Sequence, residues 1–298
     1  MRKNIIKLLT IAAVLIISSS VSAQQQFSFT QYMNNPTQFN PAYSTISDNA
    51  NFNILGRRQL VGITGAPVTY LFNGSVPISS IGGSAGVIVL NDNDPVYKYT
   101  EVNAFLAKKV QLSGTNYLSV SLNAGFRNMK ADFSQVDPSD PKFQTGDVNE
   151  TIPNLGFGVM FFGSDYYVGL SVPRFTLKQT QINTNVSDSY YLSAAWLKDL
   201  GDDFKIKPAC LLAYPGPNLP LSYNLSATFY AKNVVGLGVN YHSDNMVAGI
   251  LSLFLDNNFK IGYSYQVATG KYALGGSINT TQELSLGYSF GKGGIKLL

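Results

Sequence analysis

The chain alternates between apolar residues and small or polar residues over many short stretches. Residues 283–290 read ELSLGYSF, so leucine, tyrosine and phenylalanine occupy every second position. Residues 258–265 (NFKIGYSY) and 117–127 (YLSVSLNAGFR) repeat this pattern. Successive side chains of a β-strand point to opposite faces, so a period of two predicts strands with one apolar face.

The same pattern predicts about fourteen strands and no long helix. Their approximate ranges are 51–58, 67–76, 83–90, 98–110, 116–127, 153–163, 165–172, 188–200, 203–212, 219–230, 233–242, 245–255, 258–265 and 280–290. Beyond the N-terminal region, no apolar run approaches the length of about 18 residues that a membrane-spanning helix requires.

Two features of these strands favour a membrane barrel over a soluble sandwich. The face opposite the apolar one is rich in glycine, serine and asparagine but poor in lysine and glutamate. The apolar face often ends in an aromatic residue that suits a membrane interface, as at Tyr166, Trp196, Tyr241, Tyr265 and Phe290. We therefore predict an all-β fold, a transmembrane antiparallel β-barrel that covers residues 51–290.

The predicted connections tend to alternate between short and long. Short ones lie at 163–165, 201–203, 231–233 and 256–258, and longer ones at 59–66, 91–97, 128–152, 173–187, 213–218 and 266–279. The link at 243–244 is short and breaks this alternation. Barrels of the outer membrane have short periplasmic turns and long outer loops. An even number of strands then places both termini in the periplasm. The links 59–66 and 128–152 would lie at the outer end, where they extend outside the cell or fold into the lumen.

The first 23 residues have the organisation of a secretory signal peptide. Arg2, Lys3 and Lys7 precede an apolar run at 8–17, and small residues lead to an expected cleavage after Ala23. The alternative is a membrane anchor, but the run is shorter than the about 20 residues that a spanning helix needs. The signal contains no cysteine, so it offers no site for lipoprotein attachment.

Residues 24–50 differ from both the signal and the barrel. They are polar, yet they contain Phe27, Tyr32 and Tyr43, which are unusual in a disordered leader. We interpret them as a plug packed inside the barrel, and the alternative is a periplasmic tail. Residues 291–298 form a short C-terminal tail.

Composition agrees with a membrane barrel and argues against nucleic acid as a partner. Charged residues are 13% of the chain and aromatic residues 12%, and the charged share is about half that of a soluble domain. Removing the signal takes three of the 21 basic residues and leaves 18 against 17 acidic residues, a net charge of +1. No basic stripe remains to bind nucleic acid.

The residues that could support catalysis or hold a cofactor are few. One histidine, His242, lies two residues before Asp244, but no nucleophile elbow accompanies them. A single histidine and a single cysteine, Cys210, cannot form a zinc site. Residues 91–95 (NDNDP) lack the glycine and the distal glutamate of a calcium loop. We expect no enzyme activity, no metal and no cofactor.

Two segments interrupt the alternation. Residues 26–44 read QFSFTQYMNNPTQFNPAYS, with Pro36 and Pro41 inside them. Residues 57–69 read RRQLVGITGAPVT and contain Arg57, Arg58, Gly62, Gly65 and Pro67. The first resembles the pattern QFSQYMFNPLxxNPAYAG and the second RQQWVGIDGAPxT, both found in the PorP/SprF family of type IX secretion proteins of Bacteroidota. The C-terminal strands also resemble that family, with Gln266 and Gln282 where it has aspartate and histidine.

The resemblance implies a fourteen-stranded outer-membrane barrel similar to FadL-like porins, acting in type IX secretion or gliding motility. It implies two kinds of partner: a secreted adhesin held by its C-terminal domain at the cell surface, and periplasmic lipoproteins of the machinery. The two quoted segments would be plug and loop elements. The barrel's outer face would meet outer-membrane lipid.

Two other functions compete with this expectation. The alternative is a transporter or channel for small or hydrophobic solutes, which needs a continuous path through the lumen. A lipase-like enzyme would need a serine and a histidine within reach of each other. Under the leading hypothesis, the contact surface lies in the loops 128–152 and 173–187, with Phe133, Phe143, Phe175, Pro138, Pro141 and Pro173.

Overall fold

The computed structural model describes residues 28–132, 147–177, 188–216, 220–269, 280–291 and 294–298. The proposed signal peptide, Phe27 and the predicted contact residues Phe133, Pro138, Pro141 and Phe143 lie outside these ranges. In the described part of the chain, no helix is long and apolar enough to cross a bilayer.

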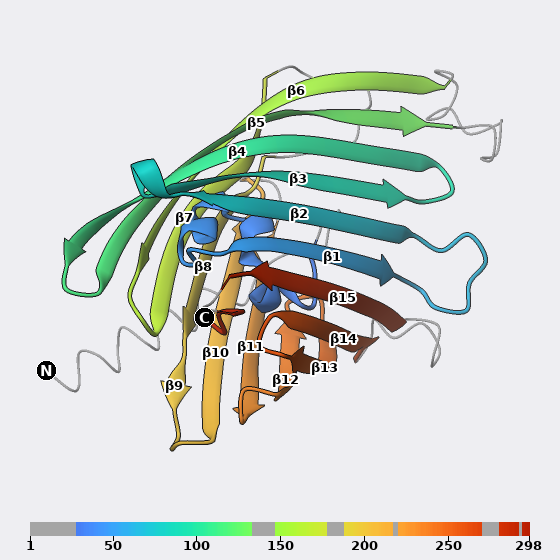
Figure 1. Cartoon of the computed structure of the whole chain (residues 1–298). Helices are drawn as coiled ribbons and strands as arrows, with labels where there is room; N and C mark the ends of the chain where they lie inside the picture. The colour runs from blue at the N-terminus through green and yellow to red at the C-terminus, as the bar shows by residue number, and fades with distance from the viewer. Residues whose placement is uncertain (1–27, 133–146, 178–187, 217–219, 270–279, 292–293) are drawn as a thin grey trace, which may run out of the picture.

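The fold is a closed antiparallel barrel of fourteen strands (Figure 1). The strands are β1 (Ala50–Arg58), β2 (Val68–Ile78), β3 (Gly83–Asn93), β4 (Tyr97–Ser113), β5 (Asn116–Ala131), β6 (Val148–Phe162), β7 (Tyr166–Thr176), β8 (Tyr190–Trp196), β10 (Phe204–Tyr214), β11 (Ser222–Ala231), β12 (Val235–His242), β13 (Met246–Leu255), β14 (Phe259–Ala268) and β15 (Thr280–Phe290). A two-residue strand, β9 (Lys198–Asp199), continues β8 after Leu197 and pairs with β10. Each strand pairs with its neighbour in sequence, and β1 closes the ring against β15 from Ala50↔Phe290 to Arg58↔Gln282.

Alternation along the strands sorts the side chains as the sequence predicts. On β15, Leu284 and Phe290 point outward and are 54% and 58% exposed, whereas Glu283 and Ser289 point inward and are 1% and 0% exposed. An exposed apolar outer face is the expected surface of a barrel whose solvent is lipid. Exposed aromatic residues lie at both ends of this face, including Tyr70, Tyr214, Tyr241 and Tyr265 at one end and Trp196, Phe204, Phe229 and Phe290 at the other.

The connections separate by length between the two ends of the barrel. At the end that we call the short-turn end, the six links contain two to four residues, and β1 begins and β15 ends there. At the opposite long-loop end, the links contain three to 16 residues. Residues 62–65 of the 59–67 link are exposed, so this link does not fold into the lumen.

Two expectations about the connections are wrong. The longer link expected at 91–97 is a three-residue turn at 94–96, because β3 and β4 both extend further than predicted. The Asp94 side chain accepts hydrogen bonds from the backbone N–H groups of Val96 and Tyr97, at 2.8 and 2.5 Å, and this stabilises the turn.

The second correction concerns residues 173–176, which were expected in a loop. They are the last residues of β7, and Pro173 is buried rather than exposed. The register with β6 shifts between Leu155 and Phe157, so that an extra residue of β7 stands opposite one of β6. Proline has no N–H to donate to a strand partner, and a bulge is where a sheet tolerates it. Phe175 is exposed, as expected, at 47%.

Candidate functional site

Residues 28–49, here called the inner segment, lie within the ring of strands. Every residue from 29 to 45 is buried except Asn34 and Tyr43, which are partly exposed. The segment forms three short 3-10 helices, η1 (Tyr32–Asn34), η2 (Pro36–Gln38) and η3 (Pro41–Thr45), drawn in blue between the walls of the barrel in Figure 1. A fourth 3-10 helix, η4 (Ser79–Ile81), lies in the link between β2 and β3.

Local sequence explains the three turns. Pro36 and Pro41 begin η2 and η3, where a proline's fixed φ suits the first turn and its missing N–H has no cost. The Asn40 side chain caps η3 by accepting a hydrogen bond from Ala42 N at 3.1 Å. The inner segment is therefore a series of preorganised turns.

Glu283 holds the beginning of the inner segment near the long-loop end. Its carboxylate accepts hydrogen bonds from the backbone N–H groups of Thr30 and Gln31, at 2.8 and 3.0 Å. Arg57 Nε lies 3.8 Å from the same carboxylate, and the Arg57 guanidinium donates to Ser28 O at 2.6 Å. A carboxylate and a guanidinium from adjacent strands thus bind the backbone of Ser28, Thr30 and Gln31.

Tyr32 fastens the segment to the wall formed by β10 and β11. Its hydroxyl lies 2.8 Å from Ala209 O and 3.0 Å from Ser226 Oγ. The Tyr32 ring is 1% exposed, so these polar partners satisfy a hydroxyl that has no access to water.

Asn40 makes the corresponding contact with β6 and β7. Its amide donates to Val159 O at 3.1 Å and approaches Leu170 O at 3.4 Å. Gly158 and Gly262 make room for the segment: a Cβ at Gly158 would lie 2.1 Å from Asn40 Oδ1, and one at Gly262 would lie 2.2 Å from Gln31 Oε1. These glycines allow polar inner side chains to reach the strand backbone.

Lysines hold the segment near the short-turn end. Lys207 Nζ donates to Met33 O at 3.0 Å and to Leu297 O of the C-terminal tail at 2.5 Å. Lys109 Nζ donates to Thr45 O at 2.9 Å. The tail thus turns back against the inner segment.

A tyrosine adds a second contact between the tail and the inner segment. Burial raises the pKa of Tyr43 well above its ordinary value, so its hydroxyl stays protonated and donates to Leu298 O. Leu298 itself is 4% exposed.

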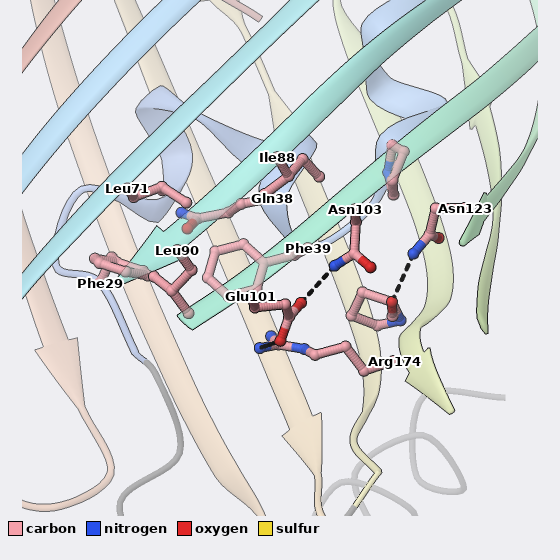
Figure 2. Close-up of a pocket in the computed structure, with 12 residues that line it drawn as sticks. Phe29, Gln38, Phe39, Leu71, Ile88, Leu90, Glu101, Asn103, Asn123 and Arg174 are labelled. Atoms are coloured by element: carbon pink, nitrogen blue, oxygen red, sulfur yellow. Dashed lines mark hydrogen bonds and ion pairs between the residues drawn. The ribbon is translucent and has the colours of Figure 1, made fainter. Parts of the chain in front are cut away.

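A second buried ionic cluster lies on the strands near the long-loop end (Figure 2). Glu101 accepts a hydrogen bond from Asn103 at 2.5 Å and lies 3.6 Å from Arg127 Nε and 3.4 Å from Arg174 NH1. Beside it, a cavity of about 20 Å³ separates the strands from Phe29 and Phe39 of the inner segment. That volume admits about one water molecule.

A comparison of the sequence with protein-family models identifies the family to which this barrel belongs. The family model described as type IX secretion system membrane protein PorP/SprF matches residues 21–288. The chain belongs to the PorP/SprF family. No curated protein sequence matches it.

Solved structures of other outer-membrane proteins share the fold of this PorP/SprF chain. It resembles the CymD monoaromatic hydrocarbon channel with a TM-score of 0.53 and 12% identity, over 91% of this chain and 95% of CymD. It also resembles the Pseudomonas putida toluene transporter TodX with a TM-score of 0.50 and 9% identity, over 89% and 95% of the two chains. At such identities the likeness establishes an outer-membrane barrel fold and nothing about the substrate.

The candidate residues from the sequence fall into two groups. Tyr32, Pro36, Pro41 and Tyr43 lie in the inner segment. Gly62 and Gly65 lie in the long-loop link with positive φ angles of 101° and 78°, and they are exposed, while Pro67 is partly buried at its end.

Arg57 and Arg58 are neighbours in the second quoted segment, but their side chains lie on opposite faces of the barrel wall. Adjacent residues of a strand point to opposite faces. Arg57 therefore enters the lumen and meets Glu283, whereas Arg58 is exposed on the outside.

Most of the charged residues that hold the inner segment from the wall were not predicted. They are Lys109, Lys207, Lys260 and Glu283, all on strands. The available signal was a charged residue on a strand face otherwise made of glycine, serine and asparagine. Such a charge is costly in a lumen unless it is paired.

His242 has a serine neighbour that the sequence did not reveal. Ser222 Oγ lies 3.2 Å from His242 Nε2, and Asp244 Oδ2 lies 3.5 Å from His242 Nδ1. However, Nδ1 accepts a hydrogen bond from Asp244 N at 3.1 Å, which places the proton on Nε2. In this tautomer Nε2 donates a hydrogen bond to Ser222 Oγ. It therefore cannot take the proton of the serine hydroxyl, which is the role of the histidine in a catalytic triad. Within the described ranges, no group of three metal-ligating side chains occurs.

Proposed function

We propose that this PorP/SprF barrel is a component of the type IX secretion and gliding machinery that binds a secreted adhesin and anchors it at the cell surface. In the same proposal it links to periplasmic lipoproteins of the machinery. The family supports the secretion role. The observation that favours protein binding over solute transport is the burial of the inner segment within the ring of strands, where it would act as a plug.

The plug is supported by the distribution of its contacts. Glu283 of β15, Tyr32 against β10 and β11, and Asn40 against β6 and β7 join the segment to walls on several sides of the ring. Asn35 Nδ2 adds a hydrogen bond to Asn73 Oδ1 of β2 at 2.5 Å. An ion or small solute would have to displace a buried segment bonded on all these sides.

We assign the two ends by the rule for outer-membrane barrels. The long-loop end faces the outside and the short-turn end, with both termini, faces the periplasm. The adhesin then meets the long-loop end, including the exposed residues 62–65, and the lipoproteins meet the short-turn end. No catalytic step is part of this proposal.

A second candidate function is a channel for small or hydrophobic solutes. Its support is the fold shared with CymD and TodX, and the apolar side chains that point inward around the 20 Å³ cavity, among them Leu71, Ile88 and Leu90. This function requires the inner segment to move, because the cavity holds about one water molecule.

Crosslinking in intact cells tests the anchoring role. A photoreactive residue replaces Ile63, which is 39% exposed at the long-loop end. A matched variant carries the same residue at Thr115, which is exposed in the turn between β4 and β5 at the short-turn end. We expect position 63 to capture a large secreted adhesin and position 115 to capture periplasmic lipoproteins, identified by mass spectrometry.

Two results would count against anchoring. The first is capture of no secreted protein from position 63 while position 115 captures its partners. The second is steady single-channel conductance of the purified barrel, which would favour the channel.

A further inference from the structure

A second cavity lies at the short-turn end, between the inner segment, β1, β2, β14, β15 and the tail. Its volume is about 60 Å³. At about 10–15 Å³ per water molecule, it holds roughly four waters or one small oxyanion. The residues that line it are mainly asparagine, serine and threonine, together with two lysines, Lys260 and Lys296.

Lys260 is a buried lysine with no compensating charge among the residues that the structure describes. The residue is 8% exposed, and its Nζ lies 3.4 Å from Asn34 O, a long distance for a hydrogen bond. In the ranges that the structure covers, no carboxylate lies within 4.0 Å of Lys260 or Lys296. Lys109, at the same end, has such a partner in Asp48 at 2.7 Å. An unpaired buried ammonium is costly, so an anion beside it would be stabilising.

The rest of the lining complements an anion and repels a cation. The cavity has no aspartate or glutamate among its lining residues, and the side chains of Asn51, Asn53 and Ser75 offer neutral hydrogen-bond donors. Lys296, the second lysine, lines the cavity from the tail, which lies on the periplasmic side in the proposed orientation.

We propose that this cavity is a binding site for a small oxyanion, a phosphate or a carboxylate group, held by Lys260 from the barrel wall and Lys296 from the tail. In this proposal the C-terminal tail supplies one side of the ligand site, and the barrel wall supplies the other. The proposal does not depend on adhesin anchoring, because it concerns the opposite end of the barrel.

The test uses the full chain purified in detergent, with inorganic phosphate as the probe and isothermal titration at constant ionic strength. Acetate is titrated in parallel to examine carboxylates. We expect saturable binding at one site, at least tenfold weaker in Lys260→Met and at least threefold weaker in Lys296→Gln. Lys232→Gln removes an exposed charge from a turn at the same end and should bind as the unmodified protein does.

Three outcomes would overturn the site. They are no saturable binding of either anion, binding by both lysine variants that is as tight as that of the unmodified protein, and competition by chloride that is as strong as that by phosphate. Binding of phosphate alone would identify a tetrahedral oxyanion, and binding of both anions would include carboxylates. If Lys260→Met does not fold, Lys296→Gln decides the question, because its side chain is exposed and its loss does not disturb the barrel wall.

Discussion

Replacing Glu283 by glutamine should release the beginning of the inner segment. The carboxylate receives the N–H groups of Thr30 and Gln31 and lies beside Arg57. The amide of glutamine keeps one acceptor oxygen, but its NH₂ group faces a second N–H donor. The change also removes the nearest counter-charge of the Arg57 guanidinium, whose side chain is 11% exposed.

The size of the effect follows from burial. Breaking a buried ion pair by removing one partner costs about 3–5 kcal/mol. Because one hydrogen bond to the backbone survives, we expect the lower value, about 3 kcal/mol, which corresponds to an about 100-fold larger open population. The double variant Glu283→Gln with Arg57→Gln removes the unpaired cation and should recover part of this loss.

Native-state hydrogen exchange measures the open population directly. The amides of residues 29–35 should exchange about 100-fold faster in Glu283→Gln, while those of β4 and β5 keep their protection. Asp199→Asn is the control, because its pair with Lys205 at 3.4 Å is largely exposed and contributes little. Unchanged exchange at residues 29–35 would refute the assignment of Glu283 as the anchor of the segment.

Three other predictions concern the same segment. Tyr32→Phe removes the hydroxyl bonded to Ala209 O and should cost about 1 kcal/mol, seen as roughly fivefold faster exchange at residues 29–35; an effect below twofold would contradict it. Lys207→Met removes the bond to Leu297 O, so carboxypeptidase should digest the tail faster than in Lys232→Gln, and equal rates would show that Lys207 does not hold it. Deletion of residues 28–45 should convert a non-conducting barrel into a conducting one in planar bilayers, whereas a silent deletion variant with native strand content would mean that something else closes the lumen.

The strands and their faces could be predicted from sequence because alternation is a local property. All fourteen predicted ranges overlap observed strands, and the exposed residues Trp196, Tyr241, Tyr265 and Phe290 lie on the outer face as predicted. The errors lie at strand ends. Pro173, expected in the link 173–187, lies in β7, and only the bulge against β6 explains its place there.

The site depended on contacts between residues far apart in sequence. The aromatic and proline-rich pattern of residues 24–50 indicated a packed segment, but its partners could not be deduced from it. Glu283 and Thr30 are 253 positions apart, and closure of the ring between β1 and β15 brings them together. The same closure brings Arg57 to Glu283, and the pairing of β11 with β12 brings Ser222 to His242.

The sequence by itself determined a barrel with an apolar outer face, because each strand's period of two depends only on neighbouring residues and on the apolar solvent outside. The tertiary structure alone decided which charges face the lumen together and which backbone groups they hold. A buried charge is stable only beside its partner, and in a barrel the partner of a residue is set by the register of strands and by ring closure, which no local pattern contains.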